Sequence, residues 1–211
     1  MTMWTCQTDS FAIHIGTSYP PDAALAPLDQ VHGAAVYRRH AGNAAAVLQA
    51  DGHWSTDINQ WLGVRTADCL PVLVGIPGVV VAAVHAGWRS VQARIMNALY
   101  RQWAEAGYDL TLAQWFVGPH IHPMSFEVQE DVVQLFADRP FANEVVWRHS
   151  DGHKSVDLVA VLQLDLQADG FARPRTVRSL VGDTVRDSSL PSYRRQGQGA
   201  GRLYSSIRRV R

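Results

Sequence analysis

Three potential metal ligands occupy similar positions in the sequence, each where an apolar stretch meets a glycine or aspartate bend. They are His32 in QVHG, Cys69 in TADC and His85 in VHAGW. Zinc accepts nitrogen and sulfur donors, and catalytic zinc sites keep a fourth position open for water or substrate. Two imidazoles and one thiolate therefore form a suitable His2Cys ligand set for zinc.

The spacing of these residues leaves a second interpretation open. The separations are far longer than those in the short C-x2-C pairs of structural zinc sites. Cys69 and His85 could instead form a thiolate–imidazole nucleophile pair without a metal.

Several neighbouring residues could assist either chemistry. Arg89 directly follows the His85 turn and could offer a planar fork to phosphate or carboxylate. Asp68 could hydrogen-bond a ligand imidazole, or it could simply cap its own bend. His120 and His122 alternate along an extended GPHIHP segment, so only one of them can face a site.

Apolar strands are expected to position these side chains. Residues 79–84 are rich in valine and predict a strand that delivers His85 to its end, while residues 63–75 predict a strand broken by a polar bend at 66–68. Helical spacing begins at Val91 and continues to about residue 106, where Gly107 is a suitable cap.

The remaining elements decide the fold class. We expect strands at 112–117 and 176–181, and helices at 128–136 and 157–168, the last ending at Gly170. There is neither a regular βαβ rhythm nor a glycine-rich phosphate loop. We therefore predict an α/β (α+β) protein, a single-domain layered sandwich of mixed sheets and helices over residues 1–211.

Composition excludes several classes of function. Nineteen Lys and Arg residues balance nineteen Asp and Glu residues, which removes the electrostatic reason to expect nucleic acid or an anionic membrane as partner. No apolar run approaches the roughly 20 residues that cross a bilayer. Two cysteines and the absence of a signal-peptide layout favour a cytoplasmic protein. The basic C-terminal end, residues 208–211, is expected to be a solvated tail.

Ordered motifs connect the chain to a known family. They are QVHG (30–33), VRTADCLPVLV (64–74), AAVHAGWRS (82–90), VGPHIHPMSFEV (117–128), DL (157–158) and SYRRQGQGAGR (192–202). In this order they resemble the bacterial laccase-domain family, also called the multicopper polyphenol oxidase family and described as purine nucleoside phosphorylases.

The resemblance implies a mononuclear zinc held by the histidine of QVHG, the cysteine of ADC and the histidine of HAGWR, which are His32, Cys69 and His85 here. It also implies phosphorolysis of adenosine, inosine, guanosine and methylthioadenosine, with adenosine deamination as a second activity. Copper is the alternative metal, from an older assignment of phenol oxidation.

Roles for the neighbouring residues follow from this chemistry. Arg89 would hold phosphate near the ribose, and Asp68 or His120 would relay a proton to the leaving base. Tyr193 and Arg194, which the final motif retains, would bind substrate together with Arg89.

The chain also departs from the family pattern. Its N-terminal region, residues 1–29, is shorter than usual, and no residue aligns with the arginine that contacts phosphate near a G-G-V-S stretch in the family. A non-catalytic zinc-binding or partner-binding module is therefore the alternative to a phosphorylase. Copper-dependent polyphenol oxidation is a third hypothesis, although three ligands are too few for a multicopper cluster.

Overall fold

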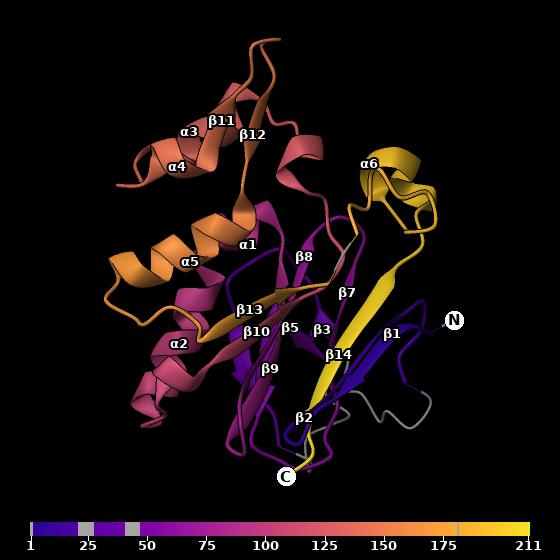
Figure 1. Cartoon of the computed structure of the whole chain (residues 1–211), viewed down its shortest axis with the longest axis vertical. Coiled ribbons are helices and arrows are strands. Elements are labelled where there is room, and N and C mark those ends of the chain that lie inside the picture. The colour runs from indigo at the N-terminus through magenta and orange to yellow at the C-terminus, as the bar shows by residue number, and fades with distance from the viewer. Residues whose placement is uncertain (1, 21–27, 41–46, 181) are drawn as a thin grey trace.

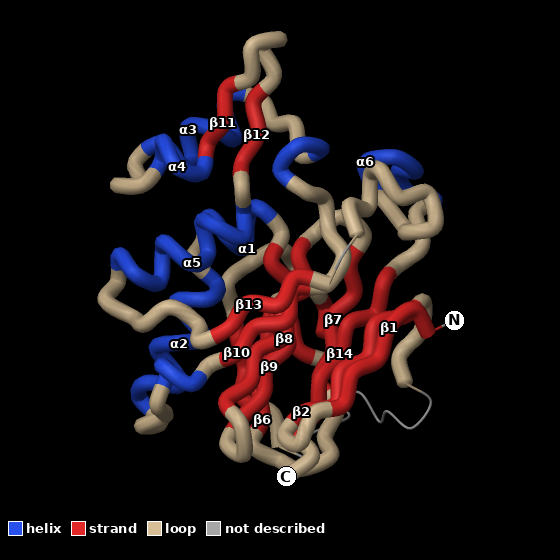
Figure 2. The backbone as a smooth tube through the Cα atoms, in the orientation of Figure 1, coloured by secondary structure: helices blue, strands red, loops and turns tan. Residues whose placement is uncertain are grey.

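The computed structural model describes residues 2–20, 28–40, 47–180 and 182–211. Two main β-sheets pack against each other, and helices cover the outer face of the larger sheet (Figures 1 and 2). This mixed α+β arrangement of layers confirms the predicted fold class.

The larger sheet has six strands in the order β13-β10-β8-β9-β6-β4. Their bounds are β4 Val36–Arg38, β6 Gly52–Ser55, β8 Leu70–Ile76, β9 Val80–Ala86, β10 Gln114–Val117 and β13 Thr176–Ser179. The central pair, β8 and β9, is an antiparallel hairpin that turns at Gly78, where φ is +72°. Every residue of both strands is buried, which explains why all but His85 are apolar or glycine.

The smaller sheet is antiparallel, in the order β1-β2-β14-β7. Its strands are β1 Thr2–Gln7, β2 Phe11–Gly16, β7 Leu62–Thr66 and β14 Leu203–Arg209. Residues 2–16 thus supply two strands of this sheet, while residues 21–27 lie outside the described residues.

The expectation of a solvated basic tail at the C-terminal end is wrong. Arg208 and Arg209 belong to β14, which lies between β2 and β7. The guanidinium carbon of Arg208 lies 4.7 Å from the ring centroid of Trp61, and Arg209 Nη1 donates to the Gly78 carbonyl at 2.5 Å. Long basic side chains can cover apolar surface with their stems, so local charge did not identify a buried strand.

The polar bend at residues 67–69 carries the chain from one sheet to the other. Sequence spacing predicted one interrupted strand, whereas its two halves, β7 and β8, belong to different sheets. Between the sheets lies a shared core that includes Phe11, Val64, Leu73 and Phe116. The backbone of Asp68 adopts φ +85° in the bend, a conformation unusual for a residue other than glycine.

Three helices cover the outer face of the larger sheet: α1 Trp88–Gln92, α2 Ile95–Glu105 and α5 Leu158–Ala168. The single helix expected over 91–106 is divided at Arg94, where φ is +61°. Arg94 Nη1 lies 2.6 Å from the Asp169 carboxylate beside α5, an ion pair that ties the break to the neighbouring helix. The predicted helix over 157–168 is confirmed, with Asp157 as its N-cap and Gly170 just beyond its end at φ +81°.

The remaining elements are short. They are β3 Leu28–Asp29, β5 Leu48–Gln49, α3 Glu130–Ala137, α4 Ala142–Val145, β11 Val146–Arg148, β12 Lys154–Val156 and α6 Tyr193–Gln196. The helix expected at 128–136 is α3. The strand expected at 112–117 begins two residues later as β10, because residues 110–112 form a 3-10 turn. The strand expected at 176–181 is β13, and Val181 lies outside the described residues. Within the described ranges no helix is sufficiently long and apolar to cross a membrane.

Candidate metal centre and substrate cavity

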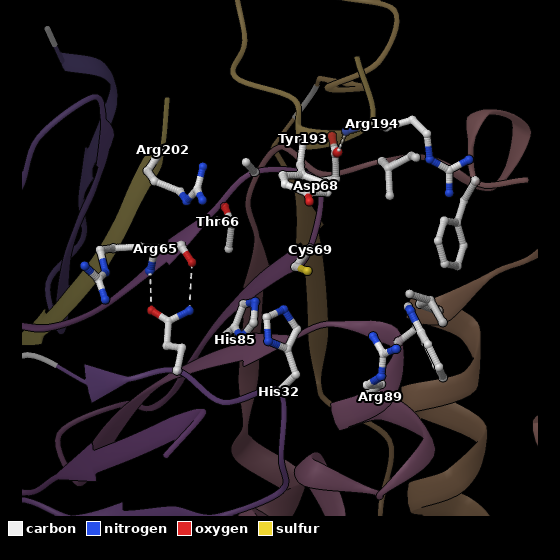
Figure 3. Close-up of a pocket in the computed structure, with 16 residues that line it drawn as sticks. His32, Arg65, Thr66, Asp68, Cys69, His85, Arg89, Tyr193, Arg194 and Arg202 are labelled. Carbon is white, nitrogen blue, oxygen red and sulfur yellow. Dashed lines mark hydrogen bonds between the residues drawn. The ribbon is translucent and has the colours of Figure 1, made fainter. Parts of the chain in front are cut away.

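The structure brings together the three residues predicted as ligands (Figure 3). His32 lies in the bend after β3, Cys69 directly precedes β8, and His85 is the penultimate residue of β9. Their ligand atoms all lie within 4.8 Å of one another. The two imidazole rings are nearly perpendicular, at an interplanar angle of 82°. We name these three residues the His/Cys group.

The donor set fits a four-coordinate metal. Zinc binds nitrogen at about 2.0–2.1 Å and thiolate sulfur at about 2.3 Å, so tetrahedral ligands lie roughly 3.3–3.7 Å apart. Donors already within 4.8 Å of one another need only a small contraction to meet that geometry. Three protein donors leave one position for substrate or water, as catalytic zinc sites require.

Asp51, which sequence reasoning missed, fixes two of the three donors. Its carboxylate is fully buried and accepts a 2.7 Å hydrogen bond from His85 Nδ1, which leaves Nε2 of that ring for a metal. It also accepts hydrogen bonds from the backbone N–H groups of Val31, His32 and Gly33, at 3.3, 3.0 and 2.6 Å. These bonds hold His32 at φ +59°, so one carboxylate positions ligands from two distant segments. The only local signal for Asp51 is an ordinary Asp-Gly dipeptide.

Hydrogen bonding within the site outweighs the effect of burial on three pKa values. Burial opposes ionisation of Asp51, yet hydrogen bonds from His85, Gly33 and His32 lower its pKa. Burial would raise the pKa of the Cys69 thiol, but His32 and His85 bring it down to about 7. Against burial, Asp51 and Cys69 raise the pKa of His85 to about 9. Without a metal, the pocket therefore favours a Cys69 thiolate beside a protonated His85, and a metal that binds both would displace the His85 proton.

Asp68 does not contact a ligand imidazole in the way that the sequence suggested. Its Oδ1 accepts a hydrogen bond from the Thr184 hydroxyl at 2.6 Å, and its Oδ2 accepts one from the backbone amide of Arg194, also at 2.6 Å. Asp68 therefore ties the bend between the sheets to helix α6, while still lining the cavity. Its catalytic role stays a prediction.

Gly87 lies against the His/Cys group. Its backbone is extended, with φ −68° and ψ 162°, a conformation that any residue can adopt, so the turn itself does not require glycine. The requirement is space, because a Cβ there would lie 3.1 Å from both Cys69 Sγ and the Cδ2 of His32.

We expect the substitution Gly87→Ala to weaken metal binding without unfolding the protein. The added methyl group would displace Cys69 or His32 by a few tenths of an ångström, and the affinity for zinc should fall roughly tenfold, as for other disturbances around metal ligands. Competition with a chromogenic chelator measures this affinity. Gly199→Ala is the matched control, because a Cβ at that position meets nothing within 4 Å. Equal affinities in the two variants would contradict the prediction.

The His/Cys group lies on the wall of a cavity of about 680 Å³. Its other lining residues are Gln30, Arg65, Thr66, Ala67, Asp68, Trp88, Arg89, Ile121, Phe126, Leu158, Tyr193, Arg194 and Arg202. Arg89, Tyr193 and Arg194, all expected from sequence to bind substrate, are among them. Arg65 and Arg202 were missed, although they lie within the motifs VRTADCLPVLV and SYRRQGQGAGR.

The proton relay expected of His120 is not supported by its position. His120 is buried, is absent from the described cavity lining, and its Nδ1 donates to the Gly118 carbonyl at 2.8 Å. Its ring packs instead against that of His122, with centroids 4.9 Å apart. Burial also lowers the pKa of His120, which keeps the ring neutral. The GPHIHP segment thus directs neither histidine to the cavity wall.

Comparison with solved structures supports the same fold. Protein NMB0706 of Neisseria meningitidis superimposes with a TM-score of 0.81 at 25% identity, over 98% of each chain.

Sequence relatives carry names of purine-metabolising enzymes. One is similar over 183 residues at 30% identity, 85% of this chain and 74% of the relative, and is named purine nucleoside phosphorylase RC0672, from Rickettsia conorii. Another, adenosine deaminase RL5 from an unknown prokaryotic organism, is 35% identical over 151 residues, 70% of this chain and 58% of its own length. The chain therefore spans less than two thirds of the second relative.

A family model matches nearly the entire chain. The model is described as multi-copper polyphenol oxidoreductase laccase and matches residues 11–210, a range that includes all three members of the His/Cys group. On this evidence the chain belongs to the multi-copper polyphenol oxidoreductase laccase family.

Proposed function

We propose that this protein is a zinc-dependent purine nucleoside phosphorylase acting on adenosine, inosine, guanosine and methylthioadenosine. The observation that carries the proposal is the position of the His/Cys group, on the wall of a cavity that also presents arginines and aromatic rings. The names of the relatives from Rickettsia conorii and Pseudomonas aeruginosa, both called purine nucleoside phosphorylases, support the choice of substrate.

The chemistry needs a cavity that binds a flat base, a ribose and an anion together. Zinc bound to the His/Cys group would supply Lewis-acid polarisation of the substrate. Phe126, Trp88 and Tyr193 offer aromatic surface on which a purine can stack. Arg89 and Arg194 lie beside these rings and would orient the nucleoside with charge-assisted hydrogen bonds.

Zinc is the metal proposed here, and copper is the alternative. Among the described residues there is one group of donors suitable for a metal, with three ligand atoms. A multicopper cluster needs several times as many ligands. Polyphenol oxidation through such a cluster therefore fits this site less well than zinc-dependent phosphorolysis, despite the description of the family.

A coupled assay tests the proposal. Purified protein should contain about one zinc per chain, as one His2Cys site holds one ion. Adenosine and phosphate together should yield adenine and ribose 1-phosphate, with no cleavage when phosphate is omitted. Zinc without turnover on any nucleoside would favour the non-catalytic module over the enzyme.

Adenosine deamination is a second candidate, favoured by the relative named adenosine deaminase RL5. The same assay separates the two reactions, since deamination releases ammonia and inosine and needs no phosphate. We expect both activities to depend on the same three ligands.

A further inference from the structure

The charges that line the cavity are unequal. The residues that line the cavity include four arginines and one acidic residue, Asp68. The four are Arg65, Arg89, Arg194 and Arg202. Both oxygens of Asp68 already accept hydrogen bonds, from Thr184 Oγ1 and from the Arg194 amide. An excess of positive charge in a concave site favours an anionic substrate.

Two of these arginines, Arg89 and Arg194, lie over aromatic rings on one side of the cavity. The guanidinium carbon of Arg89 lies 4.1 Å from the ring centroid of Trp88. Nη1 and Nη2 of Arg194 both donate to the Glu127 carbonyl at 3.1 Å. Arg194 therefore retains fewer donors for an anion, whereas the ring contact of Arg89 uses none of its N–H donors, and both groups lie beside aromatic surface.

Arg202 lies on the opposite side of the His/Cys group, next to Thr66 (Figure 3). It precedes Leu203, the β14 residue that pairs with Thr66 of β7, so the two side chains come from adjoining strands. Nη1 of Arg202 donates to the carbonyls of Ala200 and Gly201 at 2.7 and 2.9 Å, which fixes the guanidinium. Within the described part of the chain, its Nε and Nη2 have no hydrogen-bond partner.

Thr66 provides an independent observation. The residue is 1% exposed, and its hydroxyl has no hydrogen-bond partner within the described residues. Buried polar groups are nearly always paired, so a hydroxyl without a partner, in a residue that lines the cavity, can hydrogen-bond a bound water or ligand. In Figure 3 this hydroxyl points toward the guanidinium of Arg202.

We propose that Arg202 and Thr66 bind the inorganic phosphate of the reaction. This inference rests on the proposed function and moves phosphate away from Arg89, where the sequence suggested it. Guanidinium N–H groups and a threonine hydroxyl are donors that match phosphate oxygens. Phosphate and nucleoside then bind on opposite sides of the His/Cys group.

This arrangement suits the bonds that change. An oxygen of hydrogen phosphate forms a bond to ribose C1′ while the bond from C1′ to N9 breaks. The bonding electron pair goes to N9, and the proton of hydrogen phosphate passes to the purine. The products are the free purine and ribose 1-phosphate. Arg202 and Thr66 orient the attacking phosphate and neutralise part of its charge.

The test separates phosphate binding from nucleoside binding in zinc-loaded protein. Arg202→Gln should raise both the Kd for inorganic phosphate, measured by calorimetry, and the KM for phosphate, roughly tenfold to a hundredfold. The KM for adenosine should change less than about twofold, because the nucleoside contacts remain. Thr66→Val should weaken phosphate roughly threefold to tenfold without lowering Tm, since the hydroxyl has no partner to lose, and Thr66→Ser should restore binding.

Arg173→Gln is the matched control, as it removes the same charge from an exposed residue outside the cavity lining. Phosphate affinity in Arg202→Gln equal to that in Arg173→Gln would overturn the inference. If the unaltered protein cleaves no nucleoside, the proposed function fails, while the calorimetric comparison still decides whether Arg202 and Thr66 bind phosphate.

Discussion

Replacing Cys69 with alanine should remove both the metal and the turnover. The zinc content is expected to fall from about one per chain to below about a tenth after exposure to a chelator, because two imidazoles alone bind zinc much more weakly than a His2Cys set. Nucleoside cleavage should fall with the metal. Mass spectrometry of metals and the phosphorolysis assay measure the two quantities in the same preparation.

The other cysteine gives a matched control. Cys6 lies in β1, outside the His/Cys group, and Cys6→Ala should retain both zinc and activity. Zinc retained in the Cys69→Ala protein would show that Cys69 is not a metal ligand.

Chelation distinguishes the metal site from a thiolate–imidazole nucleophile pair. Removing zinc from the unaltered protein should abolish turnover, and adding zinc should restore it. Activity that survives complete removal of metal but is lost in Cys69→Ala would favour Cys69 as a nucleophile, activated by His85.

Replacing Asp51 with asparagine should weaken metal binding although Asp51 binds no metal itself. Oδ1 accepts from His32 N and His85 Nδ1, and Oδ2 accepts from Val31 N and Gly33 N. An asparagine NH2 in either position would face two N–H donors and leave them without an acceptor. The zinc affinity should fall about tenfold to a hundredfold, the usual cost of losing a residue that orients metal ligands.

The measurement is the zinc Kd, together with the visible spectrum of the cobalt-substituted protein. A disturbed ligand set changes the cobalt bands, whereas a general loss of stability leaves the bands of the folded fraction unaltered. Asp29→Asn, in β3, is the control, since its exposed carboxylate contacts Gln49 at 3.3 Å instead of a ligand. An Asp51→Asn protein with the zinc affinity of the Asp29→Asn control would show that Asp51 does not position the ligands.

Much of the candidate site could be predicted from the sequence, because only histidine, cysteine and the acidic residues commonly bind metals and these residue types can be located directly. His32, Cys69 and His85 were recognised individually by their positions at the ends of apolar stretches, and the structure brings all three together. The strand β9 and the helix α5 were also predicted. Their signals are continuous valine-rich runs and helical periodicity, which depend on neighbours in the chain.

What only the tertiary structure decided depends on contacts between distant residues. The pairing of β14 with β2 and β7 makes a buried strand from a segment that resembled a basic tail, and it also places Arg202 beside Thr66. Asp51 became part of the site only because folding brings its carboxylate to His85 and the 31–33 backbone. No local periodicity encodes such hydrogen bonds, because each needs two segments whose approach is fixed by packing of the entire core. The sequence therefore determined which side chains could hold a metal. The tertiary structure decided which residue orients these ligands and where the arginine proposed to bind an anion lies.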